Sequence, residues 1–139
     1  MATQSILVLL AHGSRDPRWR EPFETLKSAV GEDLGPGHVE LAYMEFHPPS
    51  LEDIAVKSWS EGIVRIRVLP LFLAGGAHVA NDIPAQVQAI KQRLPGMEIE
   101  VLPPVGEDPL LQSLLQEIAY AESLRLKEDC RQALGAVEG

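Results

Sequence analysis

The sequence is poor in cysteine, in basic residues and in long apolar runs, and each shortage excludes a class of protein. One cysteine, Cys130, among 139 residues cannot form an internal disulfide, so a disulfide-stapled secreted domain is excluded. Twelve Lys and Arg against 20 Asp and Glu give a net charge of −8, which argues against a surface that neutralises nucleic-acid phosphates. No apolar run approaches the roughly 18 residues of a membrane span.

The first ten residues are apolar but lack a basic segment and a small-residue cleavage site, so they are expected to form a strand and not a signal peptide. A cytoplasmic location is therefore expected. Hydrophobic residues make up 45% of the chain and charged residues 23%, which is typical of a globular protein. We expect a single domain over residues 1–124, followed by a loose polar tail over residues 125–139.

Apolar patterns predict strands and helices in alternation. Strands are expected at residues 6–10, 39–43, 63–73 and 97–101. The first helix is expected to begin near residue 21 because Pro22 disfavours regular helix before it, which leaves Asp16 to Arg20 as a separate turn. Ser50 and Asp53 form a capping-box pattern for the second helix. Asn81 is expected to cap the third, and Asp108-Pro109 to open the last.

Four such alternations predict an α/β fold in three layers, with a four-stranded parallel sheet and helices on both faces. The first and third strands are the most continuously apolar, so they are expected to be central, which gives the order 2-1-3-4. In that order the chain winds in opposite directions from these two strands, and a crevice forms beyond their carboxyl ends. This crevice is the expected ligand site.

Three of the four histidines directly follow predicted strands. They are His12, His47 and His78, whereas His38 begins a strand at the opposite end of the sheet and is excluded from the site. A neutral imidazole binds transition metals and accepts protons near neutral pH. Each histidine alone also fits a structural role in a turn, but the shared placement of His12 and His78 favours a common site.

Other polar and flexible residues surround these histidines. Gly75-Gly76 would let the backbone approach a bulky ligand, or would serve only the turn from strand to helix. Arg15 is the best placed positive charge near His12, while the neighbouring Arg18 and Arg20 fit a solvated face. Glu45 ends the second strand, where a carboxylate can bind a metal, accept a proton or simply face solvent.

Four segments together resemble the small sirohydrochlorin cobaltochelatase family, which belongs to the class II tetrapyrrole chelatases. The segments are Ala11-His12-Gly13-Ser14-Arg15, Met44-Glu45-Phe46, Pro70-Leu71-Phe72-Leu73-Ala74-Gly75-Gly76-Ala77-His78 and Asn81-Asp82-Ile83-Pro84. The resemblance extends from about Ile6 to the last helix. It implies insertion of a divalent metal into sirohydrochlorin without ATP or another nucleotide, with cobalt for cobalamin, iron for sirohaem, or nickel as the metal.

The resemblance also implies roles for individual residues. His12 matches the family's metal-binding histidine and proton acceptor, His78 its second metal-binding histidine, and Glu45 the acidic residue of the second strand. The implied substrate-binding residues are Arg15, Glu45, Leu73, Ala74, Gly75, Gly76, Ala77 and His78. Larger members contain two similar halves, so a chain of this length is expected to form a homodimer.

One position departs from the family, and two other functions remain open. Pro48 replaces a further acidic residue, and His47 beside it is a candidate substitute contact or ligand. A metal carrier or small-ligand-binding module could use the same two histidines. A histidine phosphatase also places histidine at a strand end, but it needs arginine where Ala11 stands.

Overall fold

The computed structural model describes the backbone of residues 4–35, 37–76 and 78–138, and their side chains except at 78, 79, 137 and 138. The chain divides into two units, residues 1–106 and residues 107–139. The first unit holds nearly all the elements expected from the sequence. The second consists mainly of one long helix.

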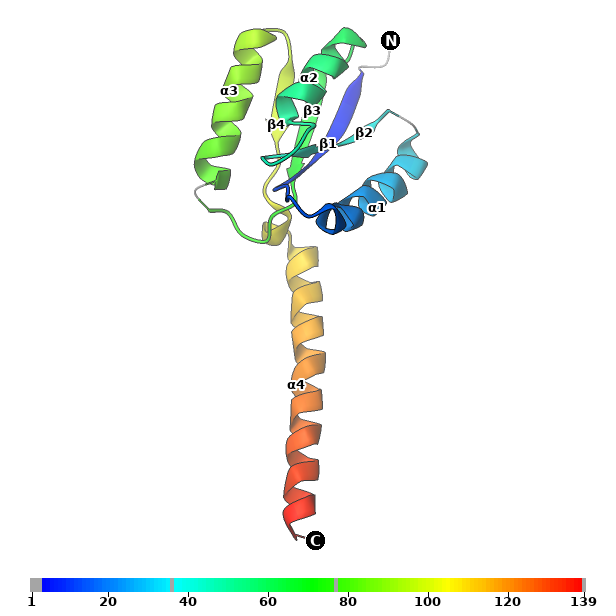
Figure 1. Ribbon diagram of the computed structural model, residues 1–139, viewed down its shortest axis with the longest axis vertical. Helices are drawn as coiled ribbons and strands as arrows, with labels where there is room; N and C mark the ends of the chain where they lie inside the picture. The colour runs from blue at the N-terminus through cyan, green and yellow to red at the C-terminus, as the bar shows by residue number, and fades with distance from the viewer. Residues whose placement is uncertain (1–3, 36, 77, 139) are drawn as a thin grey trace. The chain divides into compact units, whose positions relative to one another are not determined.

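A parallel sheet of four strands forms the centre of the first unit (Figure 1). Its strands are β1 (Ser5–Ala11), β2 (Val39–Tyr43), β3 (Arg65–Pro70) and β4 (Glu98–Val101). They lie in the order β2-β1-β3-β4, so the predicted 2-1-3-4 topology is confirmed. The register pairs Leu10 with Ala42 and with Pro70, which brings the carboxyl ends of β1, β2 and β3 to one edge.

Helices cover both faces of the sheet, as predicted. α1 (Pro17–Leu34) packs on one face, and α2 (Leu51–Ser60) and α3 (Ile83–Arg93) pack on the other (Figure 1). Alternate residues of β1 supply both cores: Val8 and Leu10 belong to the α2–α3 side, and Leu9 to the α1 side. Burial on both faces explains why β1 has an unbroken apolar sequence.

The predicted start of the first helix is wrong. α1 begins at Pro17, four residues earlier than expected, and continues through Pro22. Asp16 caps it by accepting a hydrogen bond from the Arg18 backbone N–H, and Pro17 occupies the first turn, where no backbone donor is required. Trp19 packs against the core on this side, so tertiary contacts stabilise the turn that Pro22 weakens.

Two further boundaries differ from the sequence prediction. β3 ends at Pro70, and the backbone of Leu71 continues by donating to the Leu10 carbonyl before the chain leaves the sheet. Asn81 is not the cap of the third helix. It lies within a π-helical turn, η1 (His78–Asp82), that runs directly into α3, whose N-cap is Asp82. The capping box of Ser50 and Asp53 on α2 is confirmed.

The second unit contains α4 (Pro109–Glu138), preceded by the short helix η2 (Val105–Glu107) that joins the units. The helix continues without a break past Arg125, so the prediction of a loose tail is wrong in its secondary structure. Residues such as Leu, Lys, Arg and Glu favour helix even where no apolar stripe is present, and this intrinsic propensity accounts for the helix beyond Arg125. A domain boundary at residue 124 stays a prediction. No helix in the described ranges is both long enough and apolar enough to cross a bilayer.

Candidate metal and tetrapyrrole site

His12 follows β1 directly, at the edge where three strands end. Its ring lies against the ring of Phe72, with centroids 4.5 Å apart and planes inclined by 50°. Phe72 is buried in the core beneath α2 and α3, whereas His12 is only half-buried. The contact therefore fixes one side of the imidazole and leaves part of it accessible.

The backbone of Glu45 lies against the backbone of His12 and Gly13. The Met44 N–H donates to the Ala11 carbonyl at 2.8 Å, and the Glu45 N–H donates to the His12 carbonyl at 3.1 Å. Gly13 has a φ of 96°, and a Cβ atom there would lie 2.0 Å from the Glu45 carbonyl oxygen. Glycine at position 13 is thus required for the approach that puts Glu45 beside His12.

Glu45 also lines a pocket of about 320 Å³ that reaches the start of α3. The other lining residues are Met44, Asp82, Ala85 and Gln86. Asp82 ends the π-helical turn that begins at His78, so the turn carrying His78 borders the same pocket as Glu45. Asp82 is a pocket residue that the sequence reasoning did not assign, although it lies within one of the segments quoted for the resemblance.

The predicted meeting of His12 with His78 falls partly outside the described residues. The backbone of His78 lies in η1, but its side chain, like the whole of Ala77, is outside the described part of the chain. Among the side chains that are described, no group of three or more His, Cys, Asp or Glu is arranged to hold a metal ion. The two-histidine metal site therefore stays a prediction.

The loop after β3 is open to solvent at the residues predicted to line the ligand. Leu73 is 67% exposed, and Ala74, Gly75 and Gly76 are exposed as well. A Cβ atom on Gly75 or Gly76 would meet nothing within 4 Å, and neither has the positive φ of a left-handed turn. The described surroundings therefore impose no steric need for glycine at these two positions, which favours the ligand interpretation over the turn interpretation.

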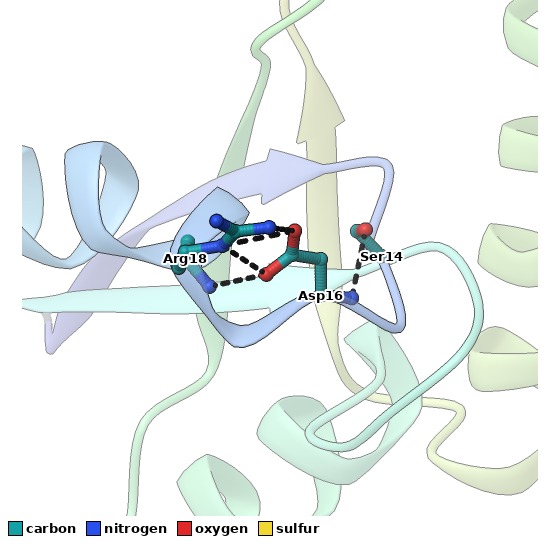
Figure 2. Close-up of polar contacts among 3 residues, drawn as sticks. All are labelled: Ser14, Asp16 and Arg18. Carbon is teal, nitrogen blue, oxygen red and sulfur yellow. Dashed lines mark hydrogen bonds and ion pairs between the residues drawn. The ribbon is translucent and has the colours of Figure 1, made fainter.

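Arg18 and Arg15, two of the three arginines after His12, lie in different environments. Figure 2 shows Asp16 between Ser14 and Arg18: its carboxylate accepts from the Arg18 side chain, and its backbone N–H donates to Ser14 Oγ. The hydrogen bonds from Arg18 lower the pKa of Asp16, and the carboxylate raises the pKa of Arg18. Arg15 instead lies over the ring of Phe46, with its guanidinium carbon 5.6 Å from the ring centroid.

His47 contacts a different part of the molecule from His12. Its ring lies 4.0 Å from that of Tyr43, a member of the core beneath α1, and its Nδ1 is 3.1 Å from the Pro48 carbonyl oxygen. Burial raises the pKa of Tyr43, so this phenol stays neutral around pH 7. The Nε2 atom of His47 is buried and has no hydrogen-bond partner among the described residues, and the role of His47 as an extra contact or ligand stays a prediction. His38 is exposed before β2, away from the site as predicted.

A larger hollow, of about 530 Å³, lies over β3 and β4 and is not the candidate site. It is lined by Ser5, Arg65, Ile66, Arg67, Glu98, Ile99 and Glu100. Arg65 pairs with Glu98 across the strands, and Arg67 pairs with Glu100. The volume is larger, but its charges are already matched and it contains no histidine.

A comparison with protein families assigns residues 6–121 to CbiX. The chain belongs to the CbiX family. A relative from Sulfurisphaera tokodaii, named sirohydrochlorin cobaltochelatase, is 33% identical over 113 residues, which cover 80% of this chain and 88% of the relative. The crystal structure of a CbiX protein from Marinobacter aquaeolei VT8 matches with a TM-score of 0.74 and 34% identity, and covers 88% of this chain and 98% of that one.

The chain also matches part of a larger chelatase. A sirohydrochlorin ferrochelatase from Priestia megaterium is 26% identical over 123 residues, which cover 88% of this chain but 46% of the ferrochelatase. The chain thus spans most of the first relative and less than half of this one. The family, the fold and the chelatase resemblance inferred from the four sequence segments are confirmed.

Proposed function

We propose that this CbiX-family chain inserts a divalent metal ion into sirohydrochlorin without a nucleotide. The observation that carries the proposal is the backbone contact between His12 and Glu45 at one edge of the sheet, together with the pocket that Glu45 shares with Asp82, the last residue of the turn carrying His78. Relatives named as cobaltochelatase and ferrochelatase support this reaction class. Cobalt is the metal we propose, with iron and nickel as the alternatives to be compared.

In the proposed reaction, His12 and His78 hold the metal ion while sirohydrochlorin lies beside them. Metal insertion requires that pyrrole nitrogens lose their protons as they replace the ligands of the metal. As the metal passes to the macrocycle, His12 releases it and would then accept one of the two pyrrole protons, and Glu45, held beside it by the Gly13 contact, would accept the second. Two or three protein ligands leave coordination positions open for the incoming nitrogens.

The substrate-binding residues proposed for this reaction remain those of the sequence prediction. Leu73 to His78 line the macrocycle, and Arg15 with the loop amides meets its carboxylates, which offsets repulsion from the net charge of −8. We further propose a homodimer in the cytoplasm, in which the partner closes the cleft. A non-catalytic metal carrier is the alternative that the experiment below must exclude.

The decisive experiment mixes the purified chain with Co²⁺ and sirohydrochlorin and follows the absorption spectrum of the macrocycle. We expect insertion well above the spontaneous rate, and a loss of at least about 100-fold in the His12→Ala variant, because a positioned acid–base group typically contributes that much. The far-UV circular dichroism of the variant should match the wild type. Insertion at the spontaneous rate by the wild type would favour the carrier, and full activity of His12→Ala would remove the role of His12.

A further inference from the structure

Phe46 is an exposed aromatic residue in a backbone conformation that is unfavourable for it. Its side chain is 55% exposed, and its φ of 77° lies in the left-handed region. A residue with a bulky side chain rarely adopts this region, whereas glycine enters it freely. Among the described residues other than glycine, Phe46 is alone in having a positive φ.

The neighbouring backbone explains why the chain turns at this residue. Hydrogen bonds to the carbonyls of Ala11 and His12 fix the backbone through Glu45, and Gly13 lies close against the Glu45 carbonyl. After Glu45 the chain turns away from the end of β1, and the left-handed residue at position 46 makes this change of direction. Glycine would satisfy this turn at lower cost, so the turn itself does not require an aromatic ring.

Arg15 holds the exposed ring on one side. Its guanidinium carbon lies 5.6 Å from the ring centroid, within the range of a cation–π contact. The carboxylate of Asp16 is occupied by Arg18, and in the described part of the chain Arg15 forms no ion pair. The guanidinium is therefore available to an anionic group from outside the chain. Phe46 and Arg15 together present an aromatic surface and a positive charge next to Glu45.

We propose that Phe46, held by Arg15, is a substrate-binding residue on which one face of the sirohydrochlorin macrocycle lies, while Arg15 binds a carboxylate at its rim. This rests on the proposed function. A planar conjugated ring stacks favourably on an aromatic side chain, and the energy does not depend on a specific hydrogen-bond pattern. The role accounts for an aromatic ring where the backbone alone would favour glycine.

The test measures binding and folding separately. Metal-free sirohydrochlorin is titrated into the wild type and into Phe46→Ala, Phe46→Tyr and Phe46→Gly, and binding is followed by the absorption change of the macrocycle. We expect about tenfold weaker binding for the alanine and glycine variants, near wild-type binding for the tyrosine variant, and a higher KM for sirohydrochlorin with little change in kcat. Unfolding midpoints should stay unchanged for alanine and rise for glycine, which relieves the left-handed residue.

A variant of Arg15 tests the cation–π partner, and a variant remote from the site serves as the control. Arg15→Met should weaken binding as well, and the double variant with Phe46→Ala should lose less than the product of the two effects, because the residues act together. Val64→Ala removes an exposed apolar side chain just before β3, at the other end of that strand, and should bind normally.

The outcomes distinguish this proposal from the proposed function. Wild-type insertion of cobalt together with undiminished sirohydrochlorin binding by Phe46→Ala would overturn the role of Phe46 and leave the chelatase function standing. A lowered unfolding midpoint with unchanged binding would likewise assign Phe46 to folding. No binding of sirohydrochlorin by the wild type would overturn both.

Discussion

At the scale of single residues, two glycines near the candidate site are present for different reasons. Gly13 has a left-handed φ and a carbonyl oxygen in the space that a Cβ atom would need. Gly75 has neither, and a Cβ atom there would face open space in the described surroundings. Glycine at position 13 is thus required for folding. Glycine at position 75 is not, and the absence of a side chain there leaves space for a bound ligand.

Gly75 should therefore tolerate a methyl group in folding but not in substrate binding. In Gly75→Ala we expect the free energy of unfolding to stay within about 0.5 kcal/mol of wild type or to rise slightly. We expect sirohydrochlorin affinity to fall about tenfold, since an added methyl group at a close contact typically costs 1–3 kcal/mol. Urea unfolding measures the free energy of unfolding, and titration with sirohydrochlorin measures the affinity.

Gly31 provides the matched control. It lies within α1, and a Cβ atom there also meets nothing within 4 Å. Gly31→Ala should raise the free energy of unfolding by about 1 kcal/mol, as expected inside a helix, and leave sirohydrochlorin binding unchanged. Equal binding by the two alanine variants would show that Gly75 does not face the substrate.

At the scale of elements, the connection between the ends of β1 and β2 determines the site. Its hydrogen bonds extend the pairing of these strands past Ala11 and Tyr43, and Gly13 permits the closest approach. His12 and Glu45 are 33 positions apart in the sequence, yet their backbones are joined here by a hydrogen bond. The placement of these two residues depends on this contact more than on either side chain.

Gly13→Ala tests the connection. The left-handed backbone alone costs about 1–2 kcal/mol for a residue with a Cβ atom, and displacement of the Glu45 carbonyl adds to it, so we expect a loss of about 2–4 kcal/mol in the free energy of unfolding. Chemical denaturation measures this loss. Metal insertion by the folded fraction should also fall, because Glu45 moves relative to His12. A variant as stable as Gly75→Ala would show that the two backbones are not in contact.

The strands and their order were predictable because they depend on patterns that extend over several residues. Burial of β1 on both faces produces an unbroken apolar run, and this placed β1 at the centre of the sheet correctly. The end of β3 was not predictable in this way, since Leu71 and Phe72 are apolar but pack beyond the last strand pair. Apolar periodicity reports burial and does not distinguish a strand from a buried loop.

The site was predictable to the extent that topology determines it. Parallel strands end at the same edge of a sheet, so residues that directly follow them lie at that edge. His12 and Glu45 do so. Phe46 and Asp82 were not assigned, because a left-handed residue and a π-helical turn have no periodic signal in the sequence. The contact of the His47 ring with Tyr43 was not predictable, since proximity in sequence to Glu45 does not decide the face of the sheet on which a ring packs.

At the scale of the whole molecule, the proposed homodimer has a consequence that can be measured. The chain covers 46% of the Priestia megaterium ferrochelatase, so two copies of this chain correspond to one such enzyme in length. If the partner closes the cleft, sedimentation equilibrium should give twice the 15.2 kDa mass of one chain, and specific activity should fall on dilution as the dimer dissociates. The loss should reverse on concentration, because mass action governs it. A species of 15.2 kDa that keeps its full specific activity would contradict the dimer while leaving the residue assignments at His12 and Glu45 in place.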